Sequence, residues 1–275
     1  MADRKPLLAL PGKLRVRPGE RVKLRDKDAG RRFGWQEDAA VAATAALREE
    51  MQALQYKLFA DGRFGLLVVL QAIDGGGKDS TIRHVFSAFN PQGCTVTAFK
   101  APSQEELRHD YLWRIHQRVP PHGEIAVLNR SHYEEVLVVR VDKLVPRDVW
   151  KARYGQINEF EKFLHLGNTL VVKLFLHISR DEQKRRFQER LDDEWKQWKF
   201  DPDDLNKRGR WPKYQTAYEA MLEKCSTAHA PWYVIPADHK WLRDLAIAQI
   251  LRDTLNALPL RPPKLHYEPK SIKVV

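Results

Sequence analysis

The sequence predicts an α/β fold in which a parallel β-sheet carries helices on both faces. Size and composition are the first indication, because 275 residues with 43% hydrophobic and 30% charged side chains suit a globular α/β domain. Strand-like and helix-like segments also alternate along the chain. The segment GLLVVLQAI at 65–73 is a continuous apolar run, typical of a strand buried on both faces. Further strands are expected at 95–101, 124–130, 169–178 and 232–237.

A helix is expected over 38–60, before the first strand. Four apolar residues recur there at spacings of four, three and four, which places them on one helix face. The pair Asp61-Gly62 is expected to end this helix. The four apolar residues are Leu47, Met51, Leu54 and Leu58.

Two later helices are expected to begin at a capping box, in which a serine is followed three residues later by a glutamate. These boxes are Ser103 with Glu106 and Ser179 with Glu182. Residues 192–213 are polar and rich in charge and tryptophan, so a mobile excursion outside the sheet is expected there. The other helices are expected to follow the first strand to about Ala88, to run from Pro146 to about Leu166, and to end at about Leu258.

The positive charge of the chain is concentrated at its two ends. Residues 1–35 carry a net charge of +7 and residues 258–275 carry +3, out of +11 for the whole chain. We therefore expect a basic extended arm at 1–35, a single domain at 36–257 and a basic tail at 258–275. Such ends attract polyanions such as nucleic acid, anionic lipid or inorganic phosphate chains, although solvated tails that aid solubility carry the same charge.

Two classes of protein are excluded by the composition. No run of eighteen apolar residues exists, so no helix is expected to cross a membrane. With Cys94 and Cys225 as the two cysteines, neither a disulfide framework nor a four-cysteine zinc site is expected. A cytoplasmic location is therefore expected.

The strongest local motif is DGGGKDST at 74–81, between a predicted strand and a predicted helix. Glycines there bring backbone N–H groups close to phosphate oxygens, and the helix N-terminus adds its positive dipole end. The match to the usual phosphate loop is incomplete, because Ala72 replaces the first glycine and Asp79 replaces the hydroxyl residue after Lys78. A glycine-rich turn is the alternative. A carboxylate at Asp74 is explained if Mg²⁺ lies between it and the phosphates.

A second group of polar residues follows the predicted strand at 124–130. The carboxyl end of that strand faces the ligand in an open α/β sheet, so Arg130 is expected to contact phosphate. Asn129 is a weak metal ligand, and Glu134 or Glu135 is expected to serve instead, unless the pair only begins a solvated helix. Lys100, at the end of the second strand, is expected at the same rim.

The helix after Ser179 is expected to be basic and to open a lid at about 180–213. Its position after a strand and before a mobile segment is where small kinases have a phosphate-clamping lid, although a solvated helix is the alternative. The cations of this region are Arg180, Lys184, Arg186, Arg190 and, in the excursion, Lys199.

Five segments resemble the polyphosphate kinase 2 family, most closely the class that accepts both AMP and ADP. The resemblance implies a phosphate-loop kinase fold with a lid, and Mg²⁺-dependent transfer of the terminal phosphoryl group of inorganic polyphosphate to AMP and ADP. It also implies a homo-oligomer. The segments are QAIDGGGKDSTIRHV at 71–85, FKAPSQEELRHDYLWRIH at 99–116, NRSHYEEVLVVRV at 129–141, FLHISRDEQKRRFQERLDD at 175–193 and APWYVIPAD at 230–238.

Residue roles follow from the motifs and the resemblance together. Asp74, Lys78 and Arg130 are expected to be catalytic, and Asp74, Glu134 and Glu135 to be metal ligands. The expected nucleotide- or phosphate-binding residues are Gly75, Gly76, Gly77, Asp79, Ser80, Thr81, Arg83, Lys100, Asn129, Tyr133, Arg180, Lys184, Arg186, Arg190 and Lys199.

Two other functions use the same features. An ATP-dependent kinase of a nucleotide or other small molecule would use the same loop, although the displaced hydroxyl at Asp79 counts against it. A non-enzymatic nucleic-acid-binding protein would use the basic ends, but the nearly neutral middle of the chain and the phosphate loop argue against it. We therefore expect polyphosphate and AMP, ADP or ATP as partners, with no nucleic acid and no membrane.

Overall fold

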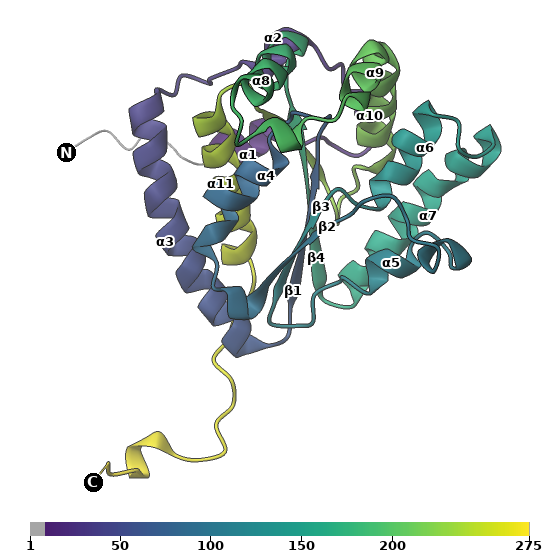
Figure 1. Ribbon diagram of the computed structural model, residues 1–275. Helices are drawn as coiled ribbons and strands as arrows, with labels where there is room; N and C mark the ends of the chain where they lie inside the picture. The colour runs from purple at the N-terminus through teal and green to yellow at the C-terminus, as the bar shows by residue number, and fades with distance from the viewer. Residues whose placement is uncertain (1–8, 275) are drawn as a thin grey trace.

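The computed structural model describes residues 9–274 and contains a five-stranded parallel sheet in the order β2-β3-β1-β4-β5 (Figure 1). The predicted α/β class and strand positions are confirmed. Every residue of the central strand β1 is buried, which explains its continuous apolar run. The strands are β1 (Gly65–Gln71), β2 (Cys94–Ala98), β3 (Ile125–Asn129), β4 (Thr169–His177) and β5 (Trp232–Pro236).

The strand order places a ligand site between β1 and β3. The chain leaves β1 toward β2 on one side of the sheet, and leaves β3 toward β4 on the other. The loops that follow these two adjacent strands therefore diverge, and they leave a crevice at the carboxyl edge of the sheet. The phosphate-loop motif and Arg130 follow β1 and β3, so the topology brings them together.

Helices cover both faces of the sheet (Figure 1). One face carries α3 (Glu37–Asp61), α4 (Lys78–His84) and α11 (Lys240–Asn256), and the other carries α5 (Trp113–His116), α6 (Val138–Val141), α7 (Arg147–Leu166) and α10 (Trp211–Cys225). Helix α3 ends as predicted, because Gly62 adopts a left-handed φ of 67° and its N–H donates to the Leu58 carbonyl at 3.1 Å.

The segment predicted to be a lid, residues 180–213 and called the lid segment below, lies above the carboxyl edge of the sheet (Figure 1). It contains α8 (Arg180–Asp192), a 3₁₀ turn (Gln197–Lys199), α9 (Asp203–Gly209) and the start of α10. The Ser179 hydroxyl caps α8 by accepting from the Glu182 N–H at 3.2 Å. The excursion predicted at 192–213 is thus confirmed to lie outside the sheet, but it contains helical turns.

The helix predicted after Ser103 is wrong in extent. The capping box forms, since the Ser103 N–H donates to the Glu106 carboxylate at 2.7 Å and the Glu106 N–H donates to the Ser103 hydroxyl at 3.2 Å. A 3₁₀ turn (Glu106–Arg108) follows, and the short α5 then begins separately. The Asp110 side chain accepts from the Leu112 N–H at 2.9 Å, and this local bond replaces a helical one.

The segment expected to be an extended arm at 1–35 is partly helical and partly packed in the core over the residues described. Short helices α1 (Ala9–Leu14) and α2 (Asp26–Ala29) form there, and Leu10, Leu14 and Val16 are buried in the core. The Val16 N–H also donates to the Trp232 carbonyl at 2.9 Å, at the edge of β5. Apolar burial therefore draws residues 9–16 into the domain, while residues 1–8 lie outside the described part.

The C-terminal tail extends from the foot of the molecule (Figure 1). Its start is attached, because the Arg261 N–H donates to the Asp61 carboxylate at 2.5 Å. Residues 261–274 are exposed and contain a single described 3₁₀ turn (Pro269–Ser271). Within residues 9–274, no helix is long and apolar enough to cross a membrane.

Candidate active site

The phosphate-loop motif forms a tight turn between β1 and α4. Gly75 and Gly77 adopt positive φ angles of 81° and 96°, which glycine tolerates best. Gly76 is required for space, because a Cβ there would lie 2.4 Å from the Ala72 Cβ. Lys78 begins α4, is buried, and donates from its Nζ to the Ala72 carbonyl at 3.1 Å. The loop is therefore preformed, with Lys78 folded back against it.

Two hydroxyl groups of this loop are engaged by the protein itself. The Thr81 hydroxyl donates to the Gly77 carbonyl at 3.0 Å, and the Thr81 side chain is fully buried. The Ser80 hydroxyl donates to the same carbonyl and accepts from Arg243 Nη1 at 2.9 Å. Asp79 accepts from the Asn129 amide at 2.8 Å, which joins the loop to the end of β3.

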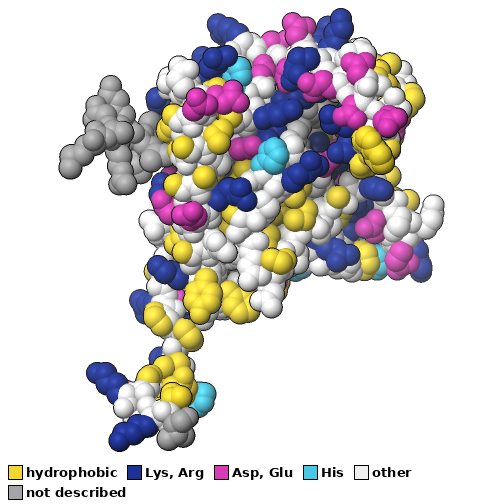
Figure 2. All heavy atoms as spheres, turned by 60° about the vertical axis from the view of Figure 1, so that its left-hand side comes forward, with side chains coloured by type: hydrophobic (Ala, Val, Ile, Leu, Met, Phe, Trp, Pro, Cys, Tyr) yellow, Lys and Arg dark blue, Asp and Glu magenta, His cyan; other side chains and the backbone are white. Residues whose placement is uncertain are grey.

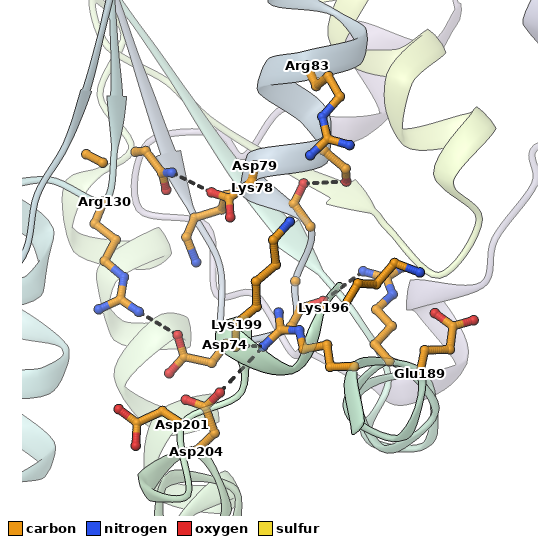
Figure 3. Close-up of a pocket in the computed structure, with 18 of the residues that line it drawn as sticks. Asp74, Lys78, Asp79, Arg83, Arg130, Glu189, Lys196, Lys199, Asp201 and Asp204 are labelled. Atoms are coloured by element: carbon orange, nitrogen blue, oxygen red, sulfur yellow. Dashed lines mark hydrogen bonds and ion pairs between the residues drawn. The ribbon is translucent and has the colours of Figure 1, made fainter. Parts of the chain in front are cut away.

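Asp74 is the centre of the ionic contacts in the crevice. Arg130 Nη2 lies 2.5 Å from Asp74 Oδ1, and Lys207 Nζ of α9 lies 3.5 Å from Oδ2. Arg130 adopts a left-handed φ of 63°, a strained conformation for a residue with a side chain. Its guanidinium points toward Asp74 (Figure 3).

The electrostatic environment keeps Asp74 and Arg130 charged. Burial alone would raise the pKa of Asp74, but the charges of Lys78, Arg130 and Lys207 lower it below its ordinary value. Burial, together with the nearby charge of Arg130, lowers the pKa of the Lys78 ammonium. Burial opposes the charge on Arg130, but Asp74 raises its pKa overall. Asp74 is therefore an ionised acid surrounded by the basic side chains of Lys78, Arg130 and Lys207.

Helix α8 supports the loop from above through its buried face. The Gln183 side chain donates to the Asp74 carbonyl at 2.7 Å, and Arg186 Nη1 donates to the Gly75 carbonyl at 3.0 Å. Arg190 continues the same face and pairs with Asp204 of α9 at 3.5 Å. Burial and the nearby charge of Asp74 raise the pKa of Asp204 to about 6. The lid segment thus contacts the loop directly.

Two cavities meet beside Asp74. The basic cavity, of about 660 Å³, is lined by ten Lys or Arg and five Asp or Glu residues. The mixed cavity, of about 700 Å³, is lined by five cations, five acids and apolar residues. Phe99, Lys100, Arg130 and Lys207 line both cavities. Figure 2 shows a cluster of Lys and Arg side chains on the face turned toward the viewer, and Figure 3 shows Lys78, Lys199 and Arg130 around one space beside Asp74.

Comparison with known proteins decides the family. The family described as Polyphosphate kinase 2 (PPK2) matches residues 34–261, which is most of the chain. The chain belongs to the polyphosphate kinase 2 family. It is 50% identical over 254 residues to the AMP/ADP-polyphosphate phosphotransferase of Meiothermus ruber, covering 92% of this chain and 95% of that one.

Two further relatives support this membership. The ADP-polyphosphate phosphotransferase of Rhodopseudomonas palustris is 43% identical over 228 residues, covering 78% of this chain and 79% of that one. The crystal structure of polyphosphate kinase 2 from Arthrobacter aurescens TC1 superposes with a TM-score of 0.89 at 41% identity, covering 94% of this chain and 93% of that one. The phosphate-loop kinase fold expected from the family resemblance is therefore present.

Most of the predicted site residues lie together in this polyphosphate kinase 2 fold. The structure places them on the wall of the basic cavity. The residues that line it are Asp74, Gly75, Gly76, Gly77, Lys78, Asp79, Ser80, Arg83, Lys100, Asn129, Arg130, Arg186, Arg190 and Lys199.

Four predicted phosphate- or nucleotide-binding residues lie elsewhere. Thr81 is fully buried and bonded to its own loop. Tyr133 is also fully buried, and its hydroxyl donates to Glu161 at 2.7 Å. Arg180 and Lys184 are exposed on α8 outside both cavities, because the buried face of that helix carries Gln183 and Arg186 instead.

The two glutamates predicted as metal ligands line the mixed cavity and not the basic one. Glu134 accepts from the Gln71 amide at 3.1 Å, and Glu135 is paired with Arg153. The Glu135 carboxylate is thus already neutralised by a cation. Within residues 9–274, no group of three or more His, Cys, Asp or Glu side chains forms a metal cage.

Several site residues escaped the sequence analysis. Lys207 and Asp204 of α9 lie in the charged excursion, where alternating charges hid which side chains face inward. Arg243 lies in α11 and is fully buried against the phosphate loop. An arginine amid the apolar positions of that helix was the available signal, because a buried guanidinium requires partners.

Proposed function

We propose that the chain transfers the terminal phosphoryl group of inorganic polyphosphate to AMP and ADP, giving ADP and ATP. The observation that carries this proposal is the contrast between two cavities that share Arg130 and Lys207. The lining side chains of the basic cavity have a net charge of +5, and those of the mixed cavity have a net charge of zero. A phosphate chain suits the first and a nucleoside monophosphate suits the second, with their phosphates meeting at Asp74.

The lining of each cavity supports this assignment. The basic cavity continues from the phosphate loop to Arg83, Lys196, Lys199 and Lys240, so a chain of phosphates finds cations along its length. The mixed cavity offers apolar walls for a base, and the Phe99 ring lies beneath the Arg114 guanidinium at 4.7 Å. The similarity to the Meiothermus ruber AMP/ADP-polyphosphate phosphotransferase points to the same donor and acceptors.

The proposed roles follow from charge and position. Lys78, Arg130 and Lys207 neutralise the oxygens of the phosphoryl group that moves between the cavities, as phosphoryl transfer requires. Asp74, which stays ionised, orients the attacking phosphate of the acceptor. The lid segment closes over the phosphates and limits transfer to water, since Gln183 and Arg186 already join α8 to the phosphate loop.

We also propose Mg²⁺ as the cofactor. The site suits a cation held between one or two carboxylates and substrate phosphates, because Asp74 and Asp79 line the basic cavity close to the loop. When bound, Mg²⁺ would neutralise phosphate charge and thereby assist transfer. Glu134 stays a predicted ligand from the mixed cavity.

The test is a reaction without ATP. The pure protein is incubated with AMP, Mg²⁺ and long-chain polyphosphate, and the nucleotides are separated by chromatography. ADP followed by ATP is the expected result. No product from polyphosphate, together with activity when ATP is the donor, would overturn the proposal in favour of an ATP-dependent kinase. Light scattering on the same sample tests the predicted homo-oligomer.

A further inference from the structure

A charged network is sealed in the core behind the active site. Lys173, in the middle of β4, places its Nζ 2.5 Å from Glu161 Oε2 and 2.8 Å from the Tyr133 hydroxyl. Glu161 Oε1 accepts from Tyr133 at 2.7 Å and lies 3.2 Å from His132 Nε2. The side chains of Lys173, Glu161, Tyr133 and His132 are each at most 1% exposed. Lys173, Glu161 and Tyr133 line neither cavity, whereas His132 lies on the wall of the mixed cavity.

Fold stability alone does not explain such a network. Taking two charges out of water is unfavourable, and apolar residues of similar size often stabilise the fold as well or better. Burial would raise the pKa of Glu161, but the charge of Lys173 and the hydrogen bond from His132 lower it, so the carboxylate stays ionised. What charged hydrogen-bonded groups provide better than apolar ones is a defined direction for each partner.

Two hydrogen-bond partners of Glu161, His132 and Tyr133, closely follow Arg130 in the sequence. Ser131 is followed by His132 and Tyr133, both anchored to Glu161, and the Ser131 hydroxyl accepts from the Tyr133 N–H at 3.2 Å. Before the anchor, Arg130 has its strained left-handed φ of 63°, and its N–H donates to the Leu70 carbonyl at 3.1 Å. The strained residue is therefore fixed on both sides.

The Lys173 ammonium group also contacts the C-terminal end of α10. Lys173 Nζ donates to the Cys225 carbonyl at 2.5 Å, and Cys225 is the last residue of α10. Helix α10 begins at Trp211, within the lid segment. Lys173 thus connects β4, the loop that follows β3, and the C-terminal end of α10, the helix that begins in the lid segment.

We propose that the Lys173–Glu161 pair, with Tyr133 and His132, positions the Arg130 guanidinium for transfer. The inference rests on the proposed function and extends it to Lys173, Glu161 and Tyr133, which line neither cavity. Without the anchor, Arg130 would relax from its left-handed conformation and lose its direction toward Asp74. Displacing the Arg130 guanidinium, which neutralises charge on the phosphoryl group in transfer, lowers kcat more than it raises KM.

The decisive variant is Tyr133→Phe, which removes one hydroxyl and keeps the ring packed on Trp232 at 4.8 Å. We expect kcat for ADP formation to fall about tenfold, with KM for AMP and for polyphosphate within about twofold of the wild type. The matched control is Tyr154→Phe, which removes another buried tyrosine hydroxyl, bonded to Arg140 at 3.0 Å outside both cavities. This control is expected to keep kcat.

A double-mutant cycle with Arg130→Lys separates positioning from general packing. If Tyr133 acts through Arg130, Tyr133→Phe changes kcat by less than about twofold in the Arg130→Lys background. An equal loss in both backgrounds, or no loss in the wild-type background, would overturn the inference. Should Tyr133→Phe fail to fold, Glu161→Gln is measured by the same cycle with the same expectations. A wild type that makes no ADP from AMP and polyphosphate overturns the proposed function itself, which keeps the two failures distinct.

Discussion

Gly76→Ala tests whether the shape of the phosphate loop limits the reaction. A Cβ at this position would lie 2.4 Å from the Ala72 Cβ and 2.8 Å from the Ile73 carbonyl oxygen. Ordinary contact begins at 3.4 Å, so the two carbons must separate by about 1 Å. The clash cannot be relieved by a rotamer change, because a methyl group has none and the opposing atoms belong to Ala72 and the backbone.

The displacement acts on Lys78 through its anchor. The carbonyl that accepts from Lys78 Nζ belongs to Ala72, so moving Ala72 by about 1 Å moves the ammonium group as well. A misplacement of this size costs about 100-fold in rate, and overpacking costs about 1–3 kcal/mol of unfolding free energy. Gly76 has an ordinary φ, so alanine adds crowding without backbone strain.

Gly155→Ala is the matched control. Gly155 is exposed in α7, and a Cβ there would meet nothing within 4 Å. Alanine should raise the unfolding free energy by about 0.5–1 kcal/mol and leave kcat unchanged. ADP formation from AMP and polyphosphate is measured for both variants, alongside urea unfolding. If Gly76→Ala kept wild-type kcat and stability, the loop would be more pliable than its packing indicates, and the argument would be refuted.

Four further changes test the charges of the site. Lys78→Ala should abolish transfer in a folded protein, and near-normal turnover would contradict its assignment. Lys207→Ala should lower kcat about 100-fold with less than about 1 kcal/mol change in unfolding free energy, and a larger KM effect alone would contradict a role in transfer. Asp204 has a pKa raised from 3.8 to about 6, so the unfolding free energy of the wild type should fall as pH rises from about 4 to 6. Urea titrations should show that Asp204→Asn reduces this fall, by at most about 3 kcal/mol in total. Asn129→Asp would bring a carboxylate to about 2.8 Å from that of Asp79, so the variant's melting temperature without Mg²⁺ should be lower than that of the wild type. Adding Mg²⁺ should raise the melting temperature of the variant more than that of the wild type.

The fold was predictable because its signals are local. A continuous apolar run such as 65–73 has few alternatives to a buried strand, and alternation with helices then implies a parallel sheet. The phosphate-loop motif was equally readable, because its glycines have direct physical roles, including the space that Gly76 leaves for Ala72. The structure of segments that depend on contacts distant in the sequence was harder to predict.

The predicted site residues that lie outside the cavities, and the cavity residues that were not predicted, have one physical cause in common. Tyr133 and Thr81 belong to motifs whose other members face the crevice, but hydrogen bonds turn both side chains inward, to Glu161 and to the Gly77 carbonyl. Lys207 was missed for the converse reason, since only the packing of α9 against the crevice selects it from the cations around it. Motif membership predicts neighbourhood, whereas the direction of a side chain depends on tertiary contacts.

The basic N-terminal segment is better understood as part of the site's frame than as a separate arm. The Arg25 carbonyl lies 3.0 Å from His177 Nε2 at the end of β4, and the Ala29 carbonyl accepts from the Asp238 N–H at 3.2 Å. Asp238 in turn accepts from the Ser179 N–H at 2.8 Å, at the start of the lid helix α8. Arg32 Nε donates to His239 at 3.0 Å, next in sequence to a lysine that lines the basic cavity. The N-terminal segment therefore supports the start of α8 through Asp238, and its contacts with His177 and His239 lie at the carboxyl ends of β4 and β5.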